Sequence, residues 1–240
     1  MYRRIVTASI VSLVALTWSS MPVAAYEGGA VSNGGSISGV VKFKGTAAAP
    51  KQLEATKDTQ VCGKHKIMDE SLEVAADGGL KNAVVSITNI TKGKAMDKAS
   101  PVFDQVGCQY VPHVLAFTAG SEVSIQNSDG ILHNIHTYSQ KNPSINRAQP
   151  KFKKVLKETF AKAEVVKVTC DAHNWMHGWF FVADNPYYAV TDATGAFKLT
   201  DVPAGDYELK VWHESGTEST QKVTVGAGAA ATANFEVAGK

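Results

Sequence analysis

The chain has 240 residues, of which 44% are hydrophobic, 19% are charged and 8% are aromatic. That length is enough for one large domain or two of ordinary size, with a core that does not depend on disulfides. Lysine and arginine number 24 against 22 aspartates and glutamates, and this near-balance argues against a nucleic-acid-binding protein. The ordinary apolar fraction argues against a disordered chain.

The first 25 residues have the pattern of a secretory signal peptide. Arg3 and Arg4 precede an apolar run over residues 5–18, and the small residues 23–25 form a cleavage site. The apolar run is too short for a membrane anchor, and no later segment could span a bilayer. We therefore expect an exported protein, periplasmic or secreted, with no membrane span after removal of the signal.

The rest of the chain has the spacing of short strands and turns, without a long helical period. Residues 26–35, rich in glycine, are expected to form a mobile leader, residues 62–79 an irregular loop, and residues 92–100 a charged linker. The basic stretch 151–160 fits either a strand or a short helix. Strands are expected near residues 36–44, 83–87, 102–104, 114–117, 122–127, 135–138, 165–169, 179–183, 188–191, 196–199, 207–212, 219–225 and 232–237. The predicted fold class is all-β, with two sandwiches.

Two segments near the C-terminus, residues 192–199 and 202–211, resemble the second half of a carboxypeptidase regulatory-like (transthyretin-like) sandwich. Residues 38–41 and 82–87 look like pieces of its first half. The resemblance implies one discontinuous sandwich from residues 36–90 and 187–237, with residues 101–185 inserted. The domain limits are then 26–100, 101–185 and 186–240; in the competing layout, the strand at residue 36 pairs with the middle domain.

One group of sulfur and imidazole side chains carries the chemistry of the chain. Cys170, His173 and Met176 lie three residues apart after a predicted strand, and His133 and His136 lie upstream. Soft sulfur ligands combined with imidazoles suit copper. Two alternatives stay open: the Cys-x-x-His pair supplies half of the ligands of a zinc site, or the residues are close by chance and Met176 is an ordinary core residue. Zinc, however, does not favour a methionine ligand.

Residues 101–185 resemble a cupredoxin, the blue copper fold, and most closely the amicyanin type. The spacing Cys-x-x-His-x-x-Met is typical of that type, and the resemblance extends to residues 119–127, the pair His133-Asn134 and residues 178–182. It implies a Greek-key sandwich that holds one copper ion, cycling between Cu(I) and Cu(II).

The same resemblance implies roles for individual residues. The copper ligands it implies are His133, Cys170, His173 and Met176. Asn134 is implied to tie the two ligand loops together through hydrogen bonds, and His173 to be the ligand nearest the surface, where electrons enter and leave. The role of His136 is left open: it is a structural residue, a partner of the ligands or an alternative ligand.

The cysteine count is odd, with Cys62, Cys108 and Cys170. If Cys170 is a copper thiolate, Cys62 and Cys108 remain as a pair that an oxidising compartment would join as a disulfide. The alternative is a second metal site, because the segment from Cys62 to Met68 repeats the Cys-x-x-His-x-x-Met spacing and His113 lies near Cys108.

The expected function is that of an exported electron carrier rather than an enzyme. Neither a multicopper-oxidase arrangement nor a Ser/His/Asp or paired-carboxylate layout occurs in the chain. The resemblance implies a redox partner such as a c-type cytochrome or a periplasmic dehydrogenase. The alternative is copper storage or delivery.

His177 is expected to be exposed, and His213 and Glu214 to be structural residues of a flanking sandwich that serves as a scaffold.

Overall fold

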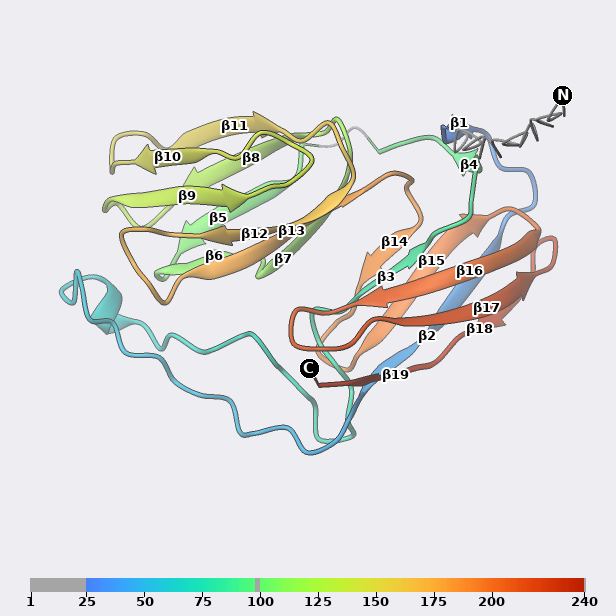
Figure 1. The fold of residues 1–240 in the computed structure, drawn as a ribbon, viewed down its shortest axis with the longest axis horizontal. Coiled ribbons are helices and arrows are strands. Elements are labelled where there is room, and N and C mark those ends of the chain that lie inside the picture. The colour runs from blue at the N-terminus through green and yellow to red at the C-terminus, as the bar shows by residue number, and fades with distance from the viewer. Residues whose placement is uncertain (1–24, 98–99, 240) are drawn as a thin grey trace, which may run out of the picture.

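The structure, a computed structural model, describes residues 25–97 and 100–239, so all of the expected signal peptide except Ala25 lies outside the described residues. The regular secondary structure of the described residues is β-strand apart from one short 3-10 helix, and the four larger sheets form two sandwiches that lie side by side (Figure 1). This confirms the all-β fold class. Within the described ranges, no helix has the length and apolar character that a membrane crossing needs.

The first sandwich consists of a five-stranded and a four-stranded sheet. The larger has the order β10 (Asn146–Gln149), β9 (His133–Tyr138), β12 (Glu164–Thr169), β13 (His177–Ala183), β7 (Val114–Thr118). The smaller has the order β11 (Val155–Thr159), β8 (Glu122–Asn127), β5 (Val102–Val106), β6 (Gln109–Val111). The ambiguous stretch 151–160 is therefore a strand, β11, at the edge of the smaller sheet.

Alternating side chains of the two sheets meet in one core. In β8, Val123 and Ile125 are fully buried while their neighbours face outward, which is the period of a strand with one buried face. Aromatic rings bridge the sheets: the Phe103 ring of β5 lies 4.7 Å from the Phe180 ring of β13, edge to face. Burying this face is what drives the two sheets together.

The second sandwich combines strands from both ends of the chain. One sheet has the order β14 (Tyr188–Val190), β3 (Val84–Ile87), β16 (Gly205–Trp212), β17 (Ser219–Val225). The other has the order β15 (Ala196–Val202), β2 (Gly35–Lys44), β18 (Ala230–Thr232), and β19 (Phe235–Ala238) also pairs with β2. Since β2 and β3 precede the first sandwich in sequence, the chain leaves this unit after β3 and returns at β14.

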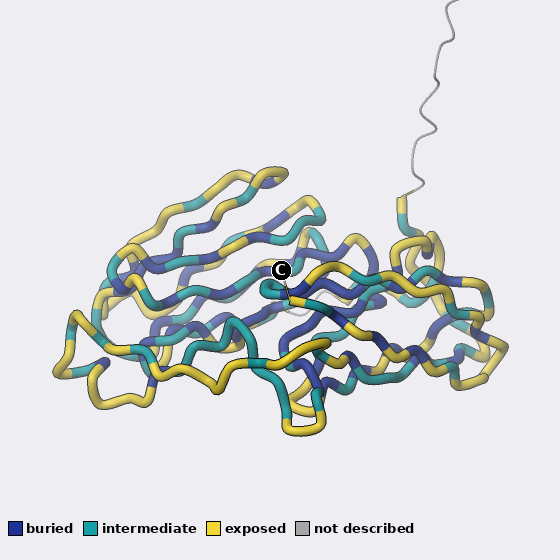
Figure 2. Tube along the Cα trace, turned by 60° about the horizontal axis from the view of Figure 1, so that its bottom comes forward, coloured by how far each residue is buried: buried dark blue, intermediate teal, exposed yellow. Residues whose placement is uncertain are grey.

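The two sandwiches meet through a small apolar cluster. Val84 and Trp212 of the second sandwich pack against Val114 of the first, and the rings of Trp179 and Trp212 lie 5.3 Å apart. All three core members of this cluster are at least nine-tenths buried. Figure 2 shows buried residues recurring through the interior of both units, with exposed residues at the periphery; these lie in loops and also in edge strands such as β10 and β17.

Residues 51–69, here called the cap segment, leave the second sandwich and lie against the end of the first (Figure 1). Backbone hydrogen bonds join the two ends of the cap segment, from Leu53 N to Ile67 O (3.0 Å) and from Asp69 N to Lys51 O (2.8 Å). It contains a short 3-10 helix, η1 (Cys62–Lys64). Cys62 and Ile67 are buried in the core of the first sandwich, so the segment belongs to that core.

Two sequence-based expectations about linkers are wrong. The expected mobile leader contains β1 (Glu27–Gly29), which pairs in parallel with β4 (Lys92–Lys94) inside the expected charged linker. The Tyr26 hydroxyl also donates a hydrogen bond to the carbonyl of Lys94 at 2.6 Å. Glycine-rich and charged stretches lack a hydrophobic period, so nothing local in them indicates a pairing partner about 65 residues away.

Candidate metal centre

Cys170 follows the last residue of β12, and the loop it begins returns to the sheet at His177 of β13. Two backbone hydrogen bonds close this loop, from Cys170 N to Met176 O (3.2 Å) and from Met176 N to His173 O (3.0 Å). Since β12 and β13 are hydrogen-bonded neighbours, the loop is a short, rigid hairpin connection. It presents the Cys170 and His173 side chains to the core at the end of the sandwich.

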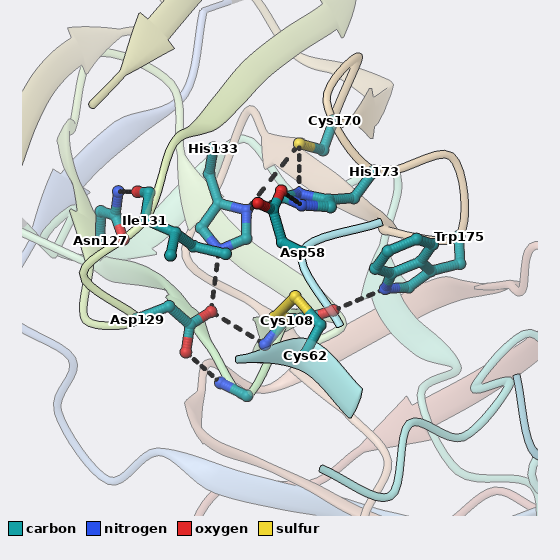
Figure 3. The surroundings of a disulfide bond; sticks show 11 residues. Asp58, Cys62, Cys108, Asn127, Asp129, Ile131, His133, Cys170, His173 and Trp175 are labelled. Atoms are coloured by element: carbon teal, nitrogen blue, oxygen red, sulfur yellow. Dashed lines mark hydrogen bonds and ion pairs between the residues drawn. A yellow bond between two sulfur atoms is a disulfide. The ribbon is translucent and has the colours of Figure 1, made fainter. Parts of the chain in front are cut away.

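The structure brings three of the four predicted ligands together at that end. The Cys170 Sγ lies 3.7 Å from His173 Nδ1 and 4.0 Å from His133 Nδ1, and the two Nδ1 atoms lie 3.0 Å apart (Figure 3). A metal held by one thiolate and two imidazoles, with bonds of about 2.0–2.3 Å, needs donor separations of about 3.3–3.8 Å. The measured separations bracket that range, and the residues fit a metal ion.

The His133 imidazole is oriented by a carboxylate that the sequence analysis overlooked. His133 is the first residue of β9, and its Nε2 lies 2.8 Å from Asp129 Oδ2. Asp129 is itself fixed by the backbone amides of Gly107 (2.6 Å) and Cys108 (2.8 Å), as Figure 3 shows. In the neutral imidazole, a carboxylate on Nε2 places the proton there and leaves the Nδ1 lone pair free for a metal ion.

The His173 imidazole has a matching partner from the cap segment. Its Nε2 lies 2.9 Å from Asp58 Oδ2, and its side chain is 0% exposed. The cap segment therefore covers the outer edge of His173; the His133 side chain is equally unexposed, so His173 as the ligand nearest the surface stays a prediction. Asp58 itself is 38% exposed and forms part of the outer surface of the site.

The charges of the cluster shift the pKa values of its members. Burial opposes protonation of His133, but hydrogen bonds to Asp129 and Cys170 outweigh it and raise the pKa of His133 to about 9. Burial lowers the pKa of His173 despite its hydrogen bond to Asp58. Burial also opposes ionisation of Asp129, yet its hydrogen bonds lower the pKa of that carboxyl. A metal ion must therefore compete with a proton at His133.

Met176 is the last residue of the loop that begins at Cys170, here called the ligand loop (residues 170–176). Its side chain is 2% exposed and belongs to the core cluster of the first sandwich, together with Cys170. Met176 follows Cys170 and His173 on the same loop, and a thioether together with one thiolate and two imidazoles is a donor set that favours copper over zinc. The chemistry of the donors therefore fits the copper ion that the sequence resemblance implies.

Asn134 and His136 occupy different places around this group. The Asn134 Oδ1 accepts a hydrogen bond from the backbone amide of Asp171 (2.5 Å), which links β9 to the ligand loop. His136 is 28% exposed and directs its Nδ1 to Asp171 Oδ1 at 3.0 Å, with its ring stacked on Tyr138. It belongs to the outer face of the sheet, and the convergent donors do not include it.

Cys62 and Cys108 form a disulfide, which confirms the expected pairing. It fastens η1 of the cap segment to the turn between β5 and β6, directly below the two imidazoles (Figure 3). The Trp175 Nε1 donates to the Cys108 carbonyl at 3.1 Å, so the ligand loop is tied to the same turn. The alternative of a second metal site on Cys62 and Cys108 is wrong, because both sulfurs are consumed by the bridge.

The position of Asp129 in the sequence hints at its role beside His133, whereas that of Asp58 does not hint at a role beside His173. Asp129 stands in a Ser-Asp-Gly turn four residues before His133, a spacing that could have drawn attention to it. Asp58 is 115 residues from His173 and lies in a segment without a strand pattern, so nothing local connects the two.

Comparison with known proteins identifies two resemblances. Residues 182–238 match the carboxypeptidase regulatory-like domain family, a stretch that contains β14 to β19. No curated protein matches the chain. Among solved structures, it is similar to a purple cupredoxin from Nitrosopumilus maritimus at 21% identity, covering 35% of this chain and 100% of that one, with a TM-score of 0.30.

The chain is also similar to two further solved structures. Amicyanin from Paracoccus versutus matches at 19% identity over 36% of this chain and 84% of its own, with a TM-score of 0.31. A copper-containing nitrite reductase from Thermus scotoductus matches at 23% identity over 38% of this chain and 24% of its own, with a TM-score of 0.31. The chain thus resembles both the carboxypeptidase regulatory-like domain and the cupredoxins, the two families that its sequence motifs indicate.

Proposed function

We propose that this protein is an exported blue copper protein that carries single electrons between redox partners. The observation that supports the proposal best is the convergence of one buried thiol and two imidazole Nδ1 atoms, separated by 3.0–4.0 Å. A trigonal His₂Cys set with a methionine nearby is the ligand set of electron-transfer copper sites. His133, Cys170, His173 and Met176 are the residues that would hold the ion.

The surroundings of the donors keep them in place. When bound, copper supplies a one-electron couple; the protein's task is to hold the same donors in both oxidation states. His133 and His173 are each clamped at Nε2 by a carboxylate, and a closed hairpin loop carries Cys170. Because these side chains are fixed by contacts outside the ligand set, little needs to move when the charge at the site changes.

Because the cap segment covers His173, we expect electrons to pass between the site and the surface through the ligand loop. The half-buried Trp175 has its ring centroid 5.0 Å from that of His173. We propose that a redox partner docks over Trp175 and that electrons pass between this ring and His173. A c-type cytochrome or a periplasmic dehydrogenase is the kind of partner that an exported carrier would serve.

The visible and electron paramagnetic resonance spectra of the copper-loaded protein test the proposal. We expect intense absorption from thiolate-to-Cu(II) charge transfer, its loss in Cys170→Ser, and its retention with a higher reduction potential in Met176→Leu. His65→Asn, which changes an exposed imidazole of the cap segment, is the control and should leave the spectrum unchanged. A colourless Cu(II)-loaded wild type would exclude a thiolate-bound copper site.

A second measurement separates electron transfer from copper storage or delivery. The donors are buried beneath the cap segment, so a carrier should keep Cu(I) in the presence of a mild chelator while it exchanges electrons rapidly with a reduced cytochrome. Loss of Cu(I) to the chelator within minutes, together with slow electron exchange, would favour delivery over electron transport.

A further inference from the structure

A second group of potential ligands lies where the two sandwiches meet. His113 stands in the turn between β6 and β7, His177 begins β13, and Glu214 follows β16 of the second sandwich. The Nε2 atom of His113 contacts Glu214 Oε1, and the Nε2 atom of His177 lies 3.5 Å from Glu214 Oε2. The expectation that His177 is exposed needs correction, because its side chain is only 25% exposed; Glu214 was expected to be structural, and it faces the first sandwich through these two contacts.

The three side chains converge at one point. One ligand atom from each lies within 4.8 Å of the other two, and the two imidazole rings are perpendicular, with centroids 5.1 Å apart. The side chains of His113 and Glu214 are 2% and 9% exposed. The two imidazoles therefore direct their Nε2 atoms at the two oxygens of a single buried carboxylate. The three residues come from three separate elements.

The surroundings of the group add an outer carboxylate and a small space. Glu70 places its Oε2 3.9 Å from the other ring nitrogen of His113, so that imidazole stands between two carboxylates. This repeats the carboxylate–imidazole arrangement found at His133 and His173, which is typical of metal-bound histidines. A cavity of about 10 Å³, room for one water molecule or ion, is lined by Glu70, His113 and His177.

The charge of the group favours a cation. Burial opposes ionisation of Glu214, but hydrogen bonds from His113 and His177 lower its pKa to about 2, so the carboxylate is charged at neutral pH. Glu70 adds a second carboxyl close to the same imidazole. Two imidazoles with one carboxylate form a ligand set that binds zinc and copper in proteins.

We propose that His113, His177 and Glu214 form a second metal site, which binds one divalent transition-metal ion, Zn²⁺ or Cu²⁺. This site contains no sulfur and is independent of the donors around Cys170. Because its ligands come from both sandwiches, a bound ion would hold the two units in a fixed orientation. His177 also follows Met176 directly, so the same ion would fix the end of the ligand loop.

Zinc titration of the protein loaded with one equivalent of Cu(I) tests this site, since Cu(I) selects the thiolate site and leaves the sulfur-free group open to zinc. We expect one zinc ion per chain by calorimetry, and a thermal midpoint that rises with zinc concentration. In His177→Gln and Glu214→Gln, zinc binding should weaken by more than about 100-fold, because even the loss of a ligand's hydrogen-bonding partner costs 10–100-fold. Gln at position 177 can still donate a hydrogen bond to Glu214, which protects the fold of that variant.

Two controls make the result specific. His65→Gln should bind zinc as the wild type does, because that imidazole is exposed and lies outside the group. Cys170→Ser should also still bind one zinc ion, so failure of the copper proposal would leave this outcome unaffected. If the wild type binds no zinc, if both glutamine variants bind it unchanged, or if Cys170→Ser abolishes binding, the proposed site is wrong and the group is only an ion-pair network.

Discussion

Removal of the Cys62–Cys108 disulfide should destabilise the metal-free protein by about 4 kcal/mol. The bridge joins residues 46 positions apart. Closing a loop of that length lowers the entropy of the unfolded chain by about 13–14 cal/mol/K, which is about 4 kcal/mol at 25 °C. Both cysteines are fully buried, so the double variant Cys62→Ala/Cys108→Ala also loses packing in the core below the imidazoles.

Urea unfolding of the metal-free protein measures this loss. The matched control is Cys170→Ala, which removes one buried sulfur without opening a loop. Hydrogen exchange should show a local effect as well: the amides of Cys62 and Gly63, bonded to Asp58 and Thr59 in the wild type, should lose protection in the double variant. A released cap segment would also expose the outer edge of His173.

The proposed role of the disulfide fails if the double variant loses no more stability than Cys170→Ala. It fails equally if the cap amides stay protected, because the segment would then be held by its side-chain packing alone. Faster reaction of the copper-loaded variant with a small external reductant, at unchanged colour, would support the view that the cap segment limits access to His173.

Three further changes test other parts of the structure. Asp129→Asn should weaken copper binding 10–100-fold, and more than Asp58→Asn, because the Asp129 side chain is 4% exposed against 38% for Asp58; a chelator competition above pH 9 removes the proton at His133 from the comparison. Glu164→Gln should cost about 1–2 kcal/mol in urea unfolding, since the carboxylate accepts backbone hydrogen bonds from residues 140–142. Burial opposes ionisation of Glu164, but these bonds lower its pKa, so its contribution is present above about pH 4.5 and is lost as the pH falls below that value. Trp212→Ala should cost about 3–5 kcal/mol and loosen the contact between the sandwiches, and an unchanged unfolding midpoint would contradict that role.

The strands were predictable where one face is buried and the other exposed. The expected strand 122–127 coincides with β8, and 219–225 coincides with β17, because alternation and turn residues bound both. Strand β10 (Asn146–Gln149) escaped prediction, since three of its four residues are exposed polar or small side chains. Its position is set by pairing with β9, which is a contact that local sequence does not encode.

The expected strand at 135–138 begins two residues earlier in the structure, at His133. The reason is that the backbone of His133 and Asn134 pairs with β10, the strand that the sequence did not reveal. His133 is therefore held by a sheet as well as by Asp129, and its imidazole starts from a rigid backbone. Because the edge strand β10 was not predicted, His133 was expected to precede the strand that in fact contains it.

Local sequence identifies donor atoms, whereas the groups that orient them come from distant segments. Cys170, His173 and Met176 share one loop, and their spacing alone indicates a metal site. Asp58, which clamps His173, belongs to the segment that leaves the second sandwich after β2, and its place depends on a disulfide and on core packing. Only the folded chain shows that pairing.

The sandwich that resembles the regulatory-like domain therefore does more than support the first sandwich. Its polypeptide supplies Asp58 to one imidazole and Glu214 to two others, so it contributes a carboxylate to each histidine group at the end of the first sandwich. A charge placed on a buried imidazole needs such a partner, because desolvation alone would drive the proton or the metal away. In the whole chain, Asp58→Asn should consequently bind copper more weakly than the wild type, since His173 would lose its carboxylate partner. Equal affinity of the two forms for copper would contradict that role of Asp58.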